Sequence, residues 1–173
     1  MCRAGQLRCG SGPCLSVDRA CDGYIDCPLT WDDEDNCPFA CAASTPSCEC
    51  RDITISCERR GLTLLPQDIE LQISRFRLSG NFFNHTLTPA SFTRYPHVVF
   101  LDLSNNSLTS LPAGMFLSLS RLRILDLRDN LLSALRNSTF LGLASLRTLH
   151  LTGNKLVAIE GWSLYGLSSL SAL

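Results

Sequence analysis

A unit of roughly 24 residues repeats through the second half of this chain and limits the folds that it can adopt. Asparagine recurs at positions 81, 106, 130 and 154, at a nearly constant interval. A repeat of this length predicts a solenoid, in which each coil contacts only its neighbours. Before each asparagine, apolar residues occupy the same three positions: Ile73, Phe76, Leu78; Val98, Leu101, Leu103; Leu122, Leu125, Leu127; and Leu146, Leu149, Leu151.

The alternation within each unit predicts a short strand, because side chains on a strand point alternately to its two faces. We expect the inward leucines to stack from coil to coil into one core. The asparagine amide has donors and an acceptor, so it can bond to the backbone where the chain bends. A second column should fill the space behind the strands: Phe92, Phe116, Phe140 and Leu164. These residues are interpreted as core.

The outward strand positions line the concave face of such a solenoid and are where we expect function. Asp102 and Asp126 occupy the same position in neighbouring units. One hypothesis is a shallow site, part apolar and part acidic, whose carboxylates bind an arginine of a cationic peptide. The alternative is a solvated polar row balanced by nearby arginines. The candidate ligand-binding residues are Arg75, Arg77, Phe100, Asp102, Ile124, Asp126, Arg128 and His150.

All ten cysteines lie between Cys2 and Cys57. A dense, even cluster of this kind predicts disulfides and an oxidising, extracellular compartment. Structural zinc is disfavoured because no Cys-x-x-Cys pair occurs. Three Asn-X-Ser/Thr sequences agree with secretion and are candidate glycosylation sites: Asn84, Asn105 and Asn137.

Residues 21–37 carry six carboxylates among three cysteines. Like charges at this density repel one another unless a cation neutralises them, so the segment predicts a calcium site. The first six cysteines enclose little apolar material, and a segment of this size needs disulfides and metal for its stability. Cysteine spacing alone leaves the pairing open.

Residues 2–37 resemble the low-density-lipoprotein receptor class A repeat. The likeness rests on the rhythm of the six cysteines, on Cys-Asp-Gly-x-x-Asp-Cys at 21–27 and on Asp-Glu-x-x-Cys at 33–37. The resemblance implies the disulfides Cys2–Cys14, Cys9–Cys27 and Cys21–Cys37. It also implies a bound calcium ion, with the side chains of Asp22, Asp26, Asp33 and Glu34 and the backbone carbonyls of Arg19 and Tyr24 as its ligands.

Two departures from the class A pattern affect what we expect of this module. The loop between Cys27 and Asp33 is one residue longer than usual, so Asp32 is a further candidate ligand. Arg19 stands where the family has an aromatic residue that helps to clamp a ligand lysine, so lysine capture of the lipoprotein type is not expected. The module is then either a calcium-folded spacer or a docking and signalling module.

After a linker at 38–40, residues 41–72 hold the last four cysteines and resemble the amino-terminal cap of extracellular leucine-rich-repeat proteins. This resemblance implies the disulfides Cys41–Cys50 and Cys48–Cys57. Residues 73–173 are then leucine-rich repeats, four complete and a fifth truncated. The expected fold is a small disulfide-rich calcium-binding module followed by an α/β leucine-rich-repeat solenoid with parallel strands on its concave face.

This order of modules resembles the ectodomain of leucine-rich-repeat G-protein-coupled receptors, of the relaxin receptor type or an invertebrate relative. The resemblance implies repeats that capture a peptide or protein ligand and a class A module that aids activation. A seven-helix membrane domain is expected beyond Leu173. The alternative is a secreted or singly anchored leucine-rich-repeat protein of adhesion or immune recognition.

Other classes of function are not expected. The acidic residues are explained by calcium, and the three histidines fall at different phases of the repeat, which argues against an enzyme. Nucleic-acid binding is disfavoured because no basic run occurs. The chain shows neither a signal peptide before Cys2 nor an apolar run long enough to span a membrane. We therefore expect a piece of a longer protein at the extracellular face of the plasma membrane.

Overall fold

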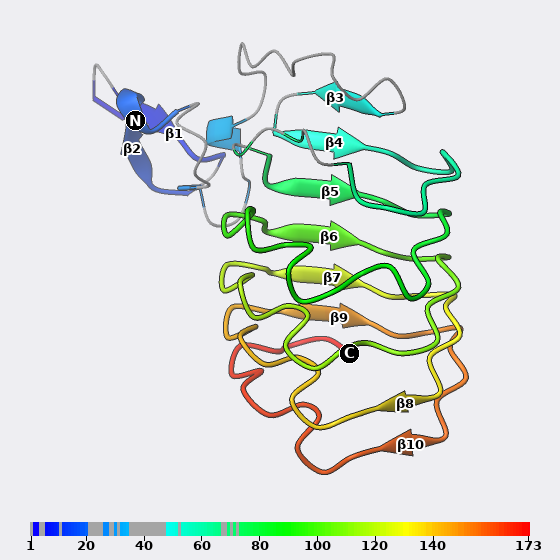
Figure 1. Ribbon diagram of the computed structural model, residues 1–173. Helices are drawn as coiled ribbons and strands as arrows, with labels where there is room; N and C mark the ends of the chain where they lie inside the picture. The colour runs from blue at the N-terminus through cyan, green and yellow to red at the C-terminus, as the bar shows by residue number, and fades with distance from the viewer. Residues whose placement is uncertain are drawn as a thin grey trace.

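The computed structural model shows an amino-terminal module beside a stack of coils (Figure 1). The predicted calcium ligands Asp22 and Tyr24 lie outside the described residues, as do Cys21, Cys37 and Cys41. The structure describes residues 2–3, 6–10, 12–20, 26–27, 30, 32–34, 48–51, 53–66, 69, 71 and 73–173.

Disulfides take the place of an apolar core in the amino-terminal module. Strands β1 (Gln6–Arg8) and β2 (Cys14–Ser16) form an antiparallel hairpin, followed by the 3₁₀ helices η1 (Val17–Arg19) and η2 (Asp32–Glu34). Disulfides join Cys2 to Cys14 and Cys9 to Cys27, and Cys9 and Cys27 are buried. Both pairs are among those that the class A resemblance implies.

Six short strands form one sheet along the solenoid, in the order β3, β4, β5, β6, β7, β9. The first two strands pair antiparallel, and each later pair is parallel. The parallel strands that the repeat predicts are therefore present. Their bounds are β3 (Glu49–Arg51), β4 (Thr54–Ser56), β5 (Arg75–Arg77), β6 (Phe100–Asp102), β7 (Ile124–Asp126) and β9 (Thr148–His150).

The hairpin of β3 and β4 covers the open end of the first coil. Ile55 and Cys57 are buried in the same core as the repeats, and a disulfide joins Cys48 to Cys57. Cys50 is also disulfide-bonded, and its predicted partner lies outside the described residues. A solenoid needs such a cap because its terminal coil has no neighbour to cover its apolar face.

The solenoid is confirmed, but its return segments differ from the helices expected on the far side of the sheet. Within the described residues the chain returns through turns and through two short parallel strands, β8 (Ala134–Leu135) and β10 (Ala158–Ile159). The N–H groups of Leu117 and Leu119 donate three residues back, as in single turns. Gly142 has a φ of 97° and lies against the backbone of Leu117, so the close packing of the coils also opposes a helix.

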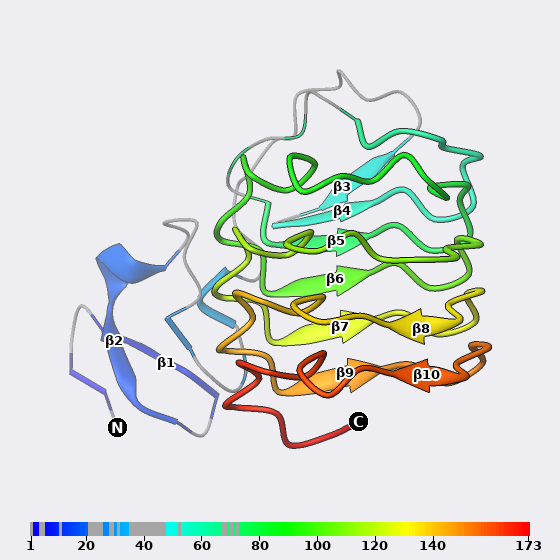
Figure 2. The same cartoon turned by 60° about the horizontal axis from the view of Figure 1, so that its bottom comes forward.

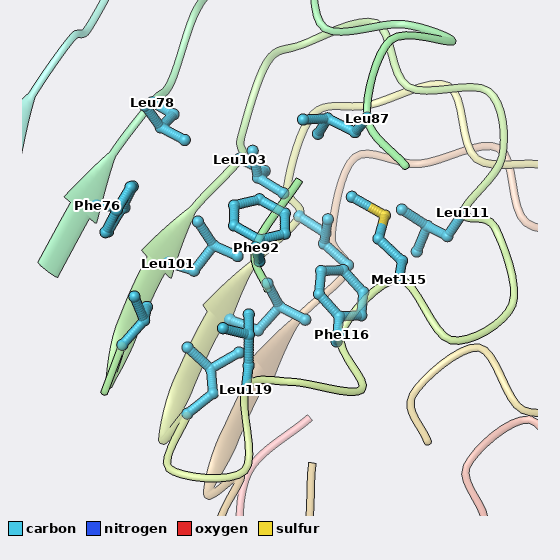
Figure 3. Packing of buried hydrophobic residues seen from close by; sticks show 14 of the residues in the cluster. Phe76, Leu78, Leu87, Phe92, Leu101, Leu103, Leu111, Met115, Phe116 and Leu119 are labelled. Carbon is cyan, nitrogen blue, oxygen red and sulfur yellow. The ribbon is translucent and has the colours of Figure 1, made fainter. Parts of the chain in front are cut away.

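The core is a set of columns that run along the stack (Figure 3). Phe92, Phe116 and Phe140 are fully buried, with ring centroids 6.5 and 6.2 Å apart between successive coils. Leu101 and Leu103 point from β6 and the turn after it toward Phe92 and Phe116. Offset or stacked rings at this separation add to the stabilisation from burial alone.

Buried asparagines join each coil to its neighbours. The side-chain amide of Asn106 donates to the carbonyl of Leu78, 3.0 Å away in the preceding coil. The Oδ1 atom of Asn130 accepts from the N–H groups of Asn106 and Leu108, both at 3.0 Å, while its amide donates to the carbonyls of Leu103 and Leu127. The expected bond to the backbone is present, and it connects successive coils.

Replacing Asn130 by alanine should destabilise the solenoid strongly. The change leaves several buried backbone groups without a partner, and each such group costs about 1–3 kcal/mol. We expect the free energy of unfolding in urea to fall by at least about 2 kcal/mol. Ser133→Ala, at an exposed position of the same coil, is the control and should change the free energy by less than about 0.5 kcal/mol. Equal effects of the two substitutions would contradict the role given to the amide.

Candidate functional site

The sheet register places the predicted ligand-binding residues in two adjacent rows on the concave face. Across the strands, Phe100 lies opposite Ile124, and Asp102 lies opposite Asp126. The first row is Arg75, Phe100, Ile124 and Thr148, and the second is Arg77, Asp102, Asp126 and His150. Arg128 follows β7 and reaches the second row, so the structure brings all eight predicted residues to one surface.

The first row offers apolar contact area. Phe100 and Ile124 are both half-buried, and they lie side by side because β6 and β7 are neighbours. Aromatic and branched side chains held on adjacent strands lose little freedom when a partner covers them, so they suit an anchoring role.

In the second row, Asp126 already has an arginine partner within the chain. The Arg128 Nε atom lies 3.0 Å from both carboxylate oxygens, and Nη2 lies 2.5 Å from Oδ2. The backbone N–H of Arg128 also donates to Asp126 Oδ1. The hydrogen bond from Arg128 to Asp126, and then the negative charge of Asp126, raise the pKa of Arg128. For Asp126, this geometry supports the hypothesis of a polar row whose charges are balanced within the chain, and not the hypothesis that Asp126 binds an arginine of a ligand.

Asp102 and Arg77 remain as contrasting charges on the same surface. One Asp102 oxygen accepts from the N–H of Ser104 at 2.9 Å, and the side chain is half-buried. Arg77 is exposed on β5, directly opposite Asp102 in register. Together with the exposed guanidinium of Arg128, the row presents one carboxylate between two cationic groups.

Two of the predicted calcium ligands lie close together in the amino-terminal module. Asp33 is 1% exposed, and its Oδ2 atom accepts from the backbone N–H of Asp26 at 2.5 Å. Asp26 Oδ2 is itself buried and accepts no hydrogen bond from the described residues, although the guanidinium of Arg19 lies 3.6 Å away. A buried carboxylate next to the backbone of a second acidic residue, whose own Oδ2 atom is buried and accepts no hydrogen bond from the described residues, fits a hard cation such as calcium. The side chain of Glu34 lies outside the described part of the chain.

Asp32, the further candidate calcium ligand, accepts hydrogen bonds within the module, and its role as a ligand stays a prediction. Its Oδ2 atom accepts from the N–H of Gly10 at 2.7 Å, and its other oxygen accepts from the hydroxyl of Thr30. The bond from Thr30 lowers the pKa of Asp32 despite the opposing effect of burial. The sulfurs of Cys9 and Cys27 lie near this carboxylate, but they form a disulfide and offer no thiolate to a metal.

The three candidate glycosylation sites differ in accessibility. Asn105 and Asn137 are exposed. Asn137 Oδ1 accepts a hydrogen bond from the N–H of Trp162, and this contact does not use the amide nitrogen to which a glycan would be attached. Asn84 is half-buried and accepts from the backbone N–H and hydroxyl of Thr109. Occupancy of all three stays a prediction.

Two features of the charged surface go beyond the sequence predictions. Asp126 ends β7 and Arg128 lies two residues later in the following turn, so their pairing could have been anticipated from the short spacing and opposite charges. Arg123 and Arg147 stand at the same position of successive repeats, just before β7 and β9. The repeat interval could have revealed that column too. The part of the chain that the structure describes contains no helix able to cross a membrane.

Comparisons with known proteins agree with this architecture. The family model for the Leucine rich repeat matches residues 72–132 and 120–173, and that for the Low-density lipoprotein receptor domain class A matches residues 1–37. The crystal structure of a TLR13-ssRNA13 complex superposes with a TM-score of 0.67 and 31% identity, over 72% of this chain and 18% of that one.

Several curated proteins are similar over the repeats. The G-protein coupled receptor GRL101 of Lymnaea stagnalis is 36% identical over 99 residues, which are 57% of this chain and 9% of that protein. Toll-like receptor 3 of Bos taurus is 33% identical over 51% of this chain and 10% of its own length. Oligodendrocyte-myelin glycoprotein of Mus musculus is 37% identical over 48% of this chain and 17% of its own length. The chain thus spans only a small part of each relative.

The geometry predicts unequal roles for the two aspartates. Asp126→Ala removes a buried carboxylate that accepts from both the backbone and the side chain of Arg128, whereas Asp102→Ala removes one bond to a half-buried group. We expect Asp126→Ala to lower the midpoint of urea unfolding clearly more than Asp102→Ala does. If Asp102→Ala had the larger effect, the assignment of Asp126 as a structural residue would be wrong.

Proposed function

This chain belongs to the leucine-rich repeat family and carries a low-density lipoprotein receptor class A domain, and on this basis we propose that it is the extracellular ligand-binding part of a leucine-rich-repeat G-protein-coupled receptor. In this proposal the repeats capture a peptide or protein ligand on their concave face, and the class A module aids activation. A seven-helix domain follows Leu173 in the parent protein, which places the chain at the outer face of the plasma membrane.

The observation that carries this proposal is the pair of side-chain rows over β5, β6, β7 and β9. Phe100 and Ile124 give contact area next to Asp102, and all three stand on strands that the asparagine bonds hold in register. Rigid strands lose little entropy on binding, which suits a capture surface. The similarity to a G-protein coupled receptor of Lymnaea stagnalis over 57% of this chain supports the receptor class.

The charges of the concave face favour a ligand with both signs of charge. A purely cationic peptide would meet Asp102 but would also meet the exposed guanidinium groups of Arg77 and Arg128. A ligand with an apolar side chain for Phe100, a basic group for Asp102 and an acidic group for an arginine fits the surface better. This refines the ligand to a mixed-charge peptide or protein segment.

The class A module is proposed to bind one calcium ion. The side chains of Asp22, Asp26, Asp33 and Glu34 would hold it together with the carbonyls of Arg19 and Tyr24, and the ion would neutralise charges that otherwise repel. The burial of Asp33 and its contact with Asp26 support this assignment.

A second candidate is a secreted or singly anchored protein of adhesion or immune recognition. The similarity to Toll-like receptor 3 and to oligodendrocyte-myelin glycoprotein favours it. The sequence that follows Leu173 separates the two candidates, because the first needs seven apolar segments of about 20 residues and the second needs one or none.

Ligand capture should depend on Phe100. Binders selected on the wild-type chain from a displayed library of extracellular peptides should lose at least about tenfold in affinity for Phe100→Ala, because truncated aromatic anchors commonly cost more than about 1.4 kcal/mol. Leu117→Ala removes a similarly apolar side chain that is 58% exposed away from the strands, and it is the control. Binders that tolerate Phe100→Ala but not Leu117→Ala would place the site elsewhere.

Calcium removal should affect the amino-terminal module alone. With a chelator, NMR signals of residues 2–37 should broaden as the repelling carboxylates lose their common cation, while the circular dichroism of the repeats stays intact. Calcium should restore the signals, and magnesium at the same concentration should do so poorly because it prefers a smaller, stricter shell. Signals that are the same with and without calcium would contradict the metal assignment.

A further inference from the structure

Two aromatic side chains stand exposed next to each other on the return segment after β10. Trp162 and Tyr165 are 66% and 65% exposed, and their ring centroids lie 5.6 Å apart in an edge-to-face arrangement. We call these two residues the aromatic pair. Figures 1 and 2 show β10 beside β8, in a sheet separate from that of the concave face. Neighbouring apolar side chains with this exposure are unfavourable in water and commonly mark a binding surface.

The aromatic pair lies on the outer surface of the solenoid. Leu117 and Leu141 stand at the position of Tyr165 in the two preceding repeats. Each has a further coil beside it, and the two side chains are still 58% and 39% exposed. Ser138, at the position of Trp162 one repeat earlier, is exposed as well. Stacking of coils leaves these positions open, so a group that covers the rings comes from outside the stack.

Two hydrogen bonds hold Asn137 beside Trp162. The Oδ1 atom of Asn137 accepts from the backbone N–H of Trp162 at 3.0 Å, and the backbone N–H of Asn137 donates to Glu160 Oε2 at 2.8 Å. The pairing of β8 with β10 keeps the two return segments in register just before these residues. Neither bond uses the amide nitrogen of Asn137, and its side chain is exposed. A group attached to this nitrogen therefore starts within a few ångströms of Trp162.

Asn137 and Trp162 are both departures from the repeat pattern. Small residues or proline occupy their two positions in the other repeats: Pro89, Ala113 and Gly161 for the first, and Ala90, Gly114 and Ser138 for the second. Both departures are exposed, so packing of the core explains neither. Asn137 also begins an Asn-Ser-Thr sequence, which accepts N-linked sugar in secreted proteins. The fold thus brings a sugar acceptor and an exposed aromatic ring to one point of the surface.

We propose that the aromatic pair is a carbohydrate-binding platform for the first N-acetylglucosamine of a glycan on Asn137. One face of a pyranose ring consists largely of C–H groups, which the electron-rich face of an aromatic ring attracts. Packing of this sugar face on Trp162 removes apolar area from water, while the hydroxyl and acetamide groups of the sugar stay hydrated. Tyr165 packs against the indole ring and limits its positions.

The platform requires the predicted glycosylation of Asn137, and hence the extracellular location of the proposed function. It requires no property of the ligand-binding surface. The strands next to it, β8 and β10, belong to a different sheet from β5, β6, β7 and β9, which carry the two rows of the concave face. A glycan at this place covers apolar area that would otherwise be open to unspecific association.

NMR and glycopeptide mass spectrometry of the chain secreted from animal cells test the platform. An endoglycosidase first trims each glycan to a single N-acetylglucosamine. Asn137 should carry this sugar, and the C–H protons of the sugar should show nuclear Overhauser contacts with the Trp162 ring and upfield ring-current shifts. Asn137→Gln identifies these signals by their loss. An unmodified Asn137, or a sugar without contacts to Trp162, would overturn the proposal.

Thermal unfolding of the same trimmed protein tests whether the contact stabilises the fold. Loss of the sugar in Asn137→Gln should lower the midpoint temperature by about 2 °C or more, as expected when an aromatic contact is lost in a chain of this length. In a Trp162→Ala background the same loss should have little effect, because the sugar has no ring to cover. Leu117→Ala, which removes an exposed side chain two repeats before Tyr165, should leave the effect of Asn137→Gln unchanged. An effect of Asn137→Gln that is equally large with and without the Trp162 ring would also overturn the platform.

Discussion

The hydrogen bonds of the buried asparagine amides are the constraint on which the rest of the solenoid depends. Each coil turns back sharply after its strand, and the turn leaves backbone groups inside the molecule that water cannot reach. Each amide satisfies groups in its own coil and in the one before it. Because buried polar groups without partners are costly, this arrangement fixes the spacing of the coils as well as their shape.

Fixed coil spacing sets the register of the parallel strands, and the register creates the concave surface. Phe76, Leu101, Leu125 and Leu149 align on the inward side, so their neighbours align outward. A surface residue in one coil therefore always meets the same position of the next coil. This is why Asp102 faces Asp126, and why the second of these carboxylates requires the guanidinium of Arg128 beside it.

The sequence predicts the features that repeat and misses those that occur once. Each repeat unit has the same pattern, and this pattern predicts the strands, the buried asparagines and the column from Phe92 to Phe140. The ion pair of Asp126 and Arg128 occurs in one coil. The repeat pattern does not predict which charged side chains form such a pair. The class of repeat predicts helices for the return segments, whereas glycines such as Gly142 and the close packing of the coils favour turns.

The two parts of the molecule are held together by different kinds of interaction. Successive coils share buried apolar columns and amide hydrogen bonds, which neither salt nor calcium alters greatly. The class A module depends instead on its disulfides and, in our proposal, on the calcium ion that its carboxylates bind. In our proposal, the concave surface then keeps its geometry whether or not the module holds its ion. Such a division would let the proposed receptor bind a ligand on rigid strands and still carry a part that responds to calcium.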